Sequence, residues 1–240
     1  MPDELADHVA AIGALAEPTR RALYRYVATQ VEPVSREQAA NAVQLPLHTA
    51  KFHLDRLVED GLLEVEFRRL SGRSGPGAGR PAKVYRRSAS HFSISLPDRR
   101  YELAGDVLAT AIDRSVRDGI DISDAVRGAA VEAGRRLVDD YLADHESASS
   151  AASHSGAAQR DDGLGRTVDV LARHGYEPQV SGTKVQLANC PFDRLAAEHT
   201  ELVCGLNLAL ITGVIDGLRT RSVTAKLVPQ TGLCCVQIEG

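Results

Sequence analysis

Apolar residues recur with helical spacing through most of the first sixty positions of the chain. Ser35 and Gln38 form a capping box at the start of one short helix, and Pro46 lies near the start of the next, which Gly61 ends. Beyond Gly61 the period changes to alternation, which predicts a strand, and residues 82–86 have the pattern of its returning partner. The pattern therefore predicts an N-terminal helix, a second helix that starts at Pro18, and then two short helices joined by a tight turn and followed by a hairpin.

The rest of the chain shows a second succession of helices and strands. Helical periodicity extends over residues 101–116 and 122–145, and residues 147–159, which are mostly Ser and Ala, predict a flexible loop. After this loop we expect a helix, a hairpin around Ser181-Gly182, a helical region from 192 to 218, and two strands over 223–228 and 233–238. The predicted fold class is α+β, with a first domain over residues 1–90, a helical linker over 91–146, a flexible loop over 147–160 and a small α+β domain over 161–240.

The composition is that of an ordinary soluble chain. Of its 240 residues 43% are hydrophobic and 25% are charged, which is enough for two modest domains with separate cores. The longest apolar stretch, residues 206–215, is interrupted by Asn207, Thr212 and Gly213, so no membrane-spanning helix is expected. The first residues contain no basic segment leading into an apolar one, so we expect a cytoplasmic protein that is not secreted.

Charge is distributed unevenly along the chain, although its net value is only −4. Residues 1–90 carry 13 Lys and Arg against 11 Asp and Glu, whereas residues 91–240 carry 15 against 21. The asymmetry is greatest between Glu66 and Arg87, where seven basic side chains accompany one acidic side chain. This segment includes the tip of the predicted hairpin, and we expect it to contact an anionic partner.

A helix, a tight turn, a second helix and a basic hairpin are the elements of a winged helix-turn-helix domain. Four segments carry a closer resemblance: residues 15–23 (LAEPTRRAL), 49–57 (TAKFHLDRL), 60–63 (DGLL) and 79–85 (GRPAKVY). Together they resemble the ArsR-type bacterial repressors, and the Gly-Arg-Pro segment is most similar to the branch that contains repressors of iron–sulfur assembly operons. The resemblance implies a sequence-specific regulator that binds an operator in double-stranded DNA. A solvated charged face, or a winged helix that contacts protein, is the alternative interpretation.

The second helix of the motif has one face for the core and another for DNA. If Ala50, Leu54 and Leu57 face inward, the residues between them lie on outer or flanking faces. His48, Thr49 and Lys51 are the residues predicted to contact base edges, and His53 either packs against the preceding helix or contacts phosphate. The basic residues of the hairpin would mainly neutralise phosphate, although Arg80 has the alternative of probing the minor groove. The predicted DNA-binding residues are His48, Thr49, Lys51, Phe52, His53, Arg56, Arg68, Arg69, Arg73, Arg80 and Lys83.

One winged helix reads a short half-site, so repressors of this type generally act as homodimers on inverted repeats. We therefore expect a homodimer. The N-terminal helix and the amphipathic helices over 101–116 and 122–145 are the predicted interfaces, and the sequence does not choose between them.

Four cysteines occupy the last part of the chain: Cys190, Cys204, Cys234 and Cys235. In a reducing compartment they are expected to serve as metal ligands, as a redox device or as core residues, and not as a disulfide framework. Their spacing is not that of a CxxC zinc ribbon. Their surroundings resemble the C-terminal half of the iron–sulfur assembly repressors, where three cysteines hold a cluster, and also small-molecule-binding domains related to vinyl reductases. The resemblance implies an iron–sulfur cluster as cofactor of a sensory domain, and zinc is the alternative because thiolates bind both.

Helix geometry adds two expectations about this site. A straight helix over residues 190–204 would separate its terminal cysteines by about 21 Å, so a shared site requires a break, which we place at His199-Thr200. Thr200 would then cap a second helix whose dipole favours thiolate at Cys204. Cys234 and Cys235 on one strand would point to opposite faces, so only one should join the site. The predicted metal ligands are Cys190, Cys204 and one of Cys234 and Cys235, with His199, the other cysteine or an exogenous group as the fourth.

Two alternatives remain open for the sensory domain. The cysteines can be structural in a domain that senses an organic molecule, or they can act through thiol oxidation. The chain contains no GxSxG, P-loop, GxGxxG or HExxH motif, so we do not expect an enzyme.

Overall fold

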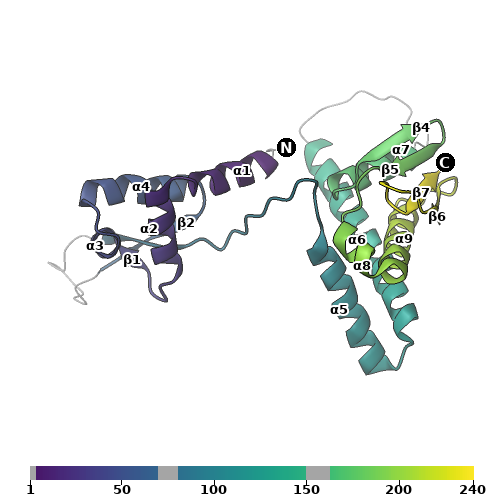
Figure 1. Cartoon of the computed structure of the whole chain (residues 1–240), viewed down its shortest axis with the longest axis horizontal. Coiled ribbons are helices and arrows are strands. Elements are labelled where there is room, and N and C mark those ends of the chain that lie inside the picture. Colours follow the sequence, from purple (N-terminus) through teal and green to yellow (C-terminus); the bar gives the residue numbers. More distant parts are fainter. Residues whose placement is uncertain (1–3, 70–80, 150–162) are drawn as a thin grey trace. The chain divides into compact units, whose positions relative to one another are not determined.

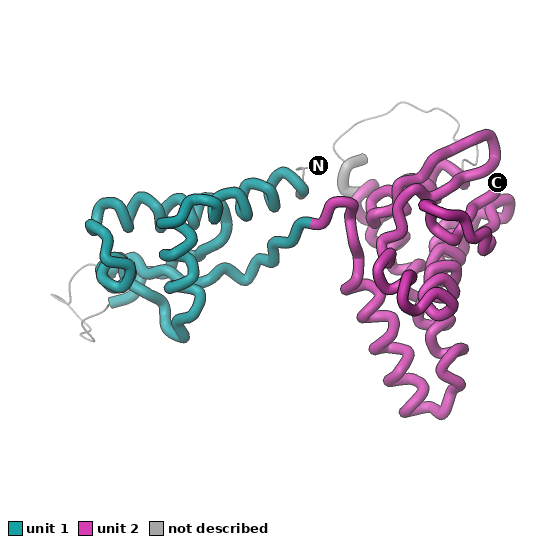
Figure 2. Tube along the Cα trace, in the orientation of Figure 1, with its two compact units in different colours: residues 1–94 teal, residues 95–240 magenta. Residues whose placement is uncertain are grey.

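The computed structural model describes residues 4–69, 81–149 and 163–240 and divides the chain into two compact units (Figures 1 and 2). Unit 1 comprises residues 1–94 and unit 2 comprises residues 95–240, drawn in teal and magenta in Figure 2. Each unit has its own hydrophobic core.

Unit 1 contains the helices and the hairpin that the sequence predicts. Its helices are α1 (Glu4–Ala14), α2 (Pro18–Ala28), α3 (Arg36–Ala42) and α4 (Leu47–Glu59), and its strands are β1 (Val34–Ser35), β2 (Leu63–Arg68) and β3 (Ala82–Arg87). The strands form an antiparallel sheet in the order β1-β3-β2. The sequence did not predict β1, because a strand of two residues has no periodicity of its own.

Local capping explains where the helices of unit 1 begin. The predicted capping box is confirmed: the Gln38 N–H donates to Ser35 Oγ at 3.2 Å, and the Ser35 N–H donates to Gln38 Oε1 at 2.8 Å. The Glu17 carboxylate caps α2 by accepting from the backbone N–H groups of Thr19 and Arg20. Gly61 ends α4 with φ +73°, a left-handed conformation that favours glycine.

Unit 2 combines helices with a second antiparallel sheet. Its helices are α5 (Tyr101–Asp118), α6 (Ile122–Ser149), α7 (Gly163–Arg173), α8 (Asp193–Glu198) and α9 (Thr200–Gly217), and its strands are β4 (Pro178–Ser181), β5 (Lys184–Leu187), β6 (Thr224–Leu227) and β7 (Val236–Glu239). The strand order is β4-β5-β7-β6. Mixed helices and small antiparallel sheets in both units agree with the predicted α+β class.

The predicted domain boundaries need correction in this part of the chain. Residues 91–146 do not form a separate linker, because buried residues of α5 and α6, such as Ala111 and Ala130, share one core with Leu210 and Val214 of α9. The physical reason is close packing of α6 on α9, where Gly134 lets the two backbones approach. Part of the predicted loop is helical, since α6 extends to Ser149, and residues 150–160 of that prediction lie outside the described residues.

Helix α9 is the most apolar helix of unit 2. By length and composition it could cross a membrane, with a mean hydropathy of 1.3. No such segment was expected from the sequence, because polar residues and a glycine interrupt the apolar stretch. Half of it is buried within unit 2, where Leu206, Leu210 and Val214 contribute to the core. The core helix of a globular unit meets the same criterion, so this finding alone does not indicate a membrane protein.

Candidate nucleic-acid interface and cysteine cluster

Helix α4 presents a buried face to the core and a polar face to solvent. Ala50, Leu54 and Leu57 are fully buried, as the helical periodicity predicts. The opposite face borders a concavity of about 780 Å³. Its lining residues are Arg20, His48, Lys51, Phe52, Asp55, Arg56 and Glu59.

Four of the predicted DNA-binding residues of α4 thus meet in one concavity, while Thr49 is half-buried beside it. Arg20 was missed because it belongs to α2, and only packing of α2 on α4 brings it to this surface. The sequence offered a weak signal, since Arg20 lies next to Arg21 just inside the start of a helix.

The structure places His53 against the preceding helices and not at the outer face of α4. Its side chain is 16% exposed, and its Nδ1 lies 3.6 Å from the Glu17 carboxylate that caps α2. Partial burial raises the pKa of Glu17, but the backbone N–H groups of Thr19 and Arg20 outweigh this effect, and the charge of His53 lowers the pKa further. Of the two predicted roles of His53, the observed position corresponds to packing.

Asp55 connects the outer face of α4 to the hairpin. Its carboxylate accepts hydrogen bonds from Lys83 Nζ and, at 3.0 Å, from the Tyr85 hydroxyl, both on β3. Burial raises the pKa of Asp55, but these two hydrogen bonds and the charge of Lys83 lower it by more. Lys83, predicted as a phosphate ligand, is therefore engaged within unit 1 and fixes the hairpin against α4.

Acidic neighbours reduce the positive charge of the described part of the hairpin. Arg68 pairs with Glu32 at 2.9 Å and with Glu66 at 2.8 Å, whereas Arg69 is exposed. Arg73 and Arg80, which the sequence also places among the DNA-binding residues, lie outside the described residues. Acidic neighbours moderate the charge of the concavity as well, since Arg56 pairs with Glu59 at 3.3 Å and with Asp60 at 3.2 Å.

The four cysteines gather in unit 2 as free thiols contributed by three segments. Cys190 precedes α8, Cys204 lies in the first turns of α9, and Cys234 and Cys235 precede β7. The thiols are close enough to affect one another's pKa: Cys234 acts on Cys190, Cys190 and Cys235 act on Cys234, and Cys235 acts on Cys204. We call these four residues the cysteine cluster.

The strand alternation expected for Cys234 and Cys235 is not observed. Strand β7 begins at Val236, so Cys234 and Cys235 lie in irregular backbone before it and do not alternate between the faces of a sheet. The Cys234 N–H donates to Leu187 O at 2.8 Å, and the Val228 N–H donates to Cys235 O at 2.7 Å. These bonds hold the turn in a conformation that brings both thiols into the cluster.

The predicted helix break is confirmed, but the predicted cap is not. Helix α8 ends at Glu198 and α9 begins at Thr200, with His199 exposed between them. The Thr200 hydroxyl donates to Ala196 O at 2.7 Å and does not cap α9. Burial raises the pKa of Cys204, and the hydrogen bond with Cys235 offsets only part of this rise.

The neighbouring thiols also favour the protonated state. The hydrogen bond with Cys234, together with burial, raises the pKa of Cys190. At Cys234 the hydrogen bond with Cys190 lowers the pKa, but the bond with Cys235 and burial outweigh it and raise the value to about 11. Among residues 4–69, 81–149 and 163–240, no group of three or more His, Cys, Asp or Glu side chains is arranged to hold a metal ion. The four predicted cysteine ligands thus lie close together as free thiols.

A buried polar network surrounds the cluster, and the sequence did not predict it. Asn207 is fully buried, accepts from the Tyr176 hydroxyl at 2.5 Å and donates to Cys234 Sγ at 3.2 Å. Asn189, which precedes Cys190, donates to Gly175 O at 2.5 Å. A polar residue in the middle of an apolar helix was the available signal for Asn207, because a buried amide requires partners.

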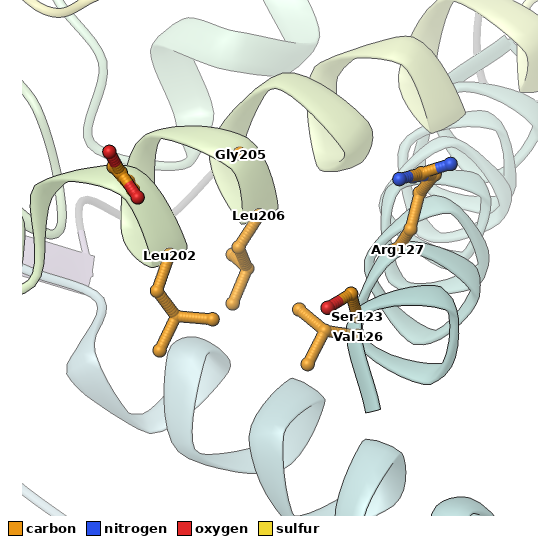
Figure 3. A pocket seen from close by; sticks show the side chains of 7 residues that line it. Ser123, Val126, Arg127, Leu202, Gly205 and Leu206 are labelled. Carbon is orange, nitrogen blue, oxygen red and sulfur yellow. The ribbon is translucent and has the colours of Figure 1, made fainter. Parts of the chain in front are cut away.

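A pocket opens in unit 2 where α6 and α9 begin (Figure 3). Its volume is about 370 Å³, within the range of small-molecule sites. Val126 of α6 lies across from Leu202 and Leu206 of α9, and Cys204 belongs to the same turn of α9. The remaining lining residues are Ser123, Arg127, Glu201 and Gly205.

Comparison with known proteins bears on unit 1. Residues 15–66 match the family model described as a helix-turn-helix domain, and this range runs from the start of α2 into β2. No curated protein matches the chain. The matched segment contains α4 and its outer face, which supports a DNA-binding helix-turn-helix domain in unit 1.

Proposed function

We propose that the chain is a cytoplasmic transcriptional repressor that binds an operator in double-stranded DNA as a homodimer and is controlled through its cysteine cluster. The observation that carries the proposal is the outer face of α4, where Arg20, Lys51 and Arg56 surround a concavity next to the hairpin. In winged helix-turn-helix domains the second helix enters the major groove and the hairpin contacts the adjacent backbone. His48 and Lys51 then reach base edges, while Arg20 and Arg69 neutralise phosphates.

Two variants distinguish groove reading from general attraction to DNA. Duplexes selected from a random library by the purified full chain serve as the probe. Lys51→Ala is expected to lower the affinity for selected duplexes more than the affinity for random ones, because a base contact carries sequence information. Arg69→Ala is expected to lower the affinity for selected and random duplexes equally. It should also reduce the salt dependence of binding by about one phosphate contact. If no duplex is enriched, or if both variants bind like the parent in mobility shifts, the proposal of sequence-specific binding fails.

Exposed apolar residues on α5 support the homodimer. Ile112 and Val116 lie four residues apart on one face of the helix and are both exposed. A second copy that covers this face would remove apolar area from water, a gain that favours association. Sedimentation of the full chain is expected to give a dimer, and Ile112→Glu is expected to give a monomer with an unchanged circular dichroism spectrum. A monomeric parent would exclude the dimer.

The cysteine cluster has the donor chemistry of a zinc or iron–sulfur site, since thiolates bind both. It offers four thiols from three segments, each within hydrogen-bonding reach of another. In this proposal Cys190, Cys204 and one or both of Cys234 and Cys235 hold the group, with His199 as a further donor. A bound group would crosslink α9 to the segments before α8 and β7. That link stabilises one arrangement of unit 2 and couples occupancy to operator affinity.

The cofactor is tested on full chain purified without oxygen. Zinc, iron and acid-labile sulfide are measured with the visible spectrum for the parent, for Cys204→Ser and for the control Thr212→Ser, which changes an α9 residue outside the cluster. Iron with sulfide that is lost only in Cys204→Ser supports a cluster, and colourless zinc lost in the same way supports a zinc site. Absence of both from the parent refutes metal control of this regulator.

The pocket beside Cys204 favours an organic effector as the second candidate. Its apolar wall of Val126, Leu202 and Leu206 suits a small hydrophobic molecule, and Arg127 suits a carboxylate on it. Gly205→Leu would fill the pocket, because no neighbouring atom lies within 4 Å of a Cβ at this position. Operator binding that responds to metabolite extracts in the metal-free parent but not in Gly205→Leu would support this candidate.

A further inference from the structure

Phe52 is an apolar side chain on the polar face of the recognition helix α4. It is 67% exposed and lines the concavity together with Arg20, Lys51 and Arg56. His48 and Arg56 lie one helical turn to either side of it, so the three residues form one row along the helix. The side chain is thus presented in the middle of the surface that faces DNA in the proposed function.

Packing restricts the orientation of the Phe52 ring. Its centroid lies 5.2 Å from that of His53, with the ring planes at 72°, which is an edge-to-face contact. His53 is itself held near Glu17 at the start of α2. The ring of Phe52 therefore contacts His53 on one side and is otherwise exposed on the outer face of α4.

We propose that Phe52 reads thymine through the C5-methyl group in the major groove, an inference that rests on the proposed function. A phenyl ring has no hydrogen-bond donor or acceptor of the kind that reads the polar edges of bases. The thymine methyl is the apolar feature of the major-groove edge, and phenylalanine is one of the side chains that contact it. The surrounding cations attract phosphate, so the Phe52 contact adds sequence preference to their general affinity.

The surroundings favour DNA over a protein partner for this residue. Arg20, Lys51 and Arg56 line the concavity with Phe52 against two acidic side chains, Asp55 and Glu59, and a polyanion complements this cationic excess. Phe67, the other strongly exposed phenylalanine of unit 1, is 70% exposed on β2 and is not part of the lining of the concavity. Phe67 is therefore a matched control, equal in chemistry and exposure but not placed on the recognition helix.

The experiment removes one methyl group from the DNA. Duplexes enriched from a random library by the full chain are resynthesised with each thymine replaced singly by deoxyuridine, which preserves base pairing. For the parent, one thymine in each half-site is expected to lower affinity about fourfold when replaced, the factor that corresponds to about 0.8 kcal/mol for one methyl group. Phe52→Ala is expected to bind the thymine and deoxyuridine duplexes equally, and Phe67→Ala is expected to retain the fourfold difference.

The outcomes distinguish the role of Phe52 from sequence-specific binding by the chain as a whole. Enriched duplexes in which every deoxyuridine substitution leaves parent affinity unchanged overturn the role of Phe52 and leave sequence-specific binding intact. A methyl effect that persists in Phe52→Ala also overturns it, because another residue then makes the contact. Failure to enrich any duplex overturns the proposed function and this inference with it.

Discussion

Replacing Gly134 by alanine tests the packing on which the core of unit 2 depends. Gly134 lies in α6 where this helix crosses α9, and an added Cβ would lie 2.0 Å from Leu210 O and 2.8 Å from Val214 N. Both neighbours are backbone atoms of α9, which cannot rotate away as a side chain would. The reverse contact is equally close, since a Cβ at Gly213 would lie 2.1 Å from Val131 O.

The magnitude follows from two opposing effects. Overpacking of a close contact costs about 1–3 kcal/mol, and contact with backbone on both sides places Gly134 at the upper end. Alanine in a helix interior is favoured over glycine by about 1 kcal/mol, which offsets part of that cost. The expected net loss is about 2 kcal/mol, which corresponds to about 4–8 °C in the melting temperature of a unit of this size.

Gly128 provides the control on the same helix. No atom outside its own helix lies within 4 Å of a Cβ at Gly128, so Gly128→Ala keeps the helix-propensity gain of about 1 kcal/mol without the clash. Differential scanning calorimetry of the full chain under reducing conditions is expected to show a lowered transition for Gly134→Ala and a raised one for Gly128→Ala. If Gly134→Ala melts at or above the parent temperature, the proposed crossing of α6 and α9 is wrong.

Three further variants test other parts of the structure. Ser35→Ala removes the capping box and is expected to cost unit 1 about 1 kcal/mol, measured as a shift of its own calorimetric transition. Asp55→Asn should destabilise unit 1 at pH 7, because hydrogen bonds keep the Asp55 pKa below its ordinary value of 3.8. That stabilisation is present above pH 3.8 and is lost as the pH falls through the lowered pKa, so chemical denaturation of parent and variant should converge in acid. Tyr176→Phe leaves the buried Asn207 carbonyl without its donor and is expected to destabilise unit 2 by about 1–3 kcal/mol.

The fold of unit 1 was largely predictable because its signals are local. A capping box, a proline near a helix start and a glycine at a helix end each act within a few residues, and the structure shows all three at the predicted places. Strand β1 escaped prediction because Val34 and Ser35 become a strand only by pairing with Tyr85 and Val84, some fifty residues away. The periodicity of the sequence does not predict this pairing of distant residues.

Unit 2 was predicted less well because its organisation depends on distant contacts. Gly134 and Gly213 each lower helix propensity, so the local sequence gives no reason to expect glycine at these two helix positions. In the structure they allow α6 and α9 to touch, and this contact places the predicted linker in the same core as the cysteine cluster. Helix lengths and the break at His199 were accessible from the sequence, but the partner of each helix was not.

The candidate sites show the same division. The outer face of α4 follows from helical geometry, whereas Arg20 joins it from α2 and Asp55 withdraws Lys83 from it, and both depend on tertiary packing. At the cysteine cluster, the predicted strand over 233–238 begins only at Val236. The alternation expected for Cys234 and Cys235 therefore does not apply to them. A shift of three residues changes which side chains meet, because alternation applies only within the strand.

The glycine crossing and the cysteine cluster occupy different parts of the same helix pair. Gly213 fixes the C-terminal half of α9 against α6, while the two helices leave a pocket between their first turns, where Cys204 lies. A metal bound by the thiols or a molecule bound in the pocket would therefore act on the first turns of α9, ahead of the crossing. Val203 and Leu206 in these turns are buried in the core of unit 2. Closely packed interiors transmit strain, so a displacement of these turns would reach α6 through the core that both helices share.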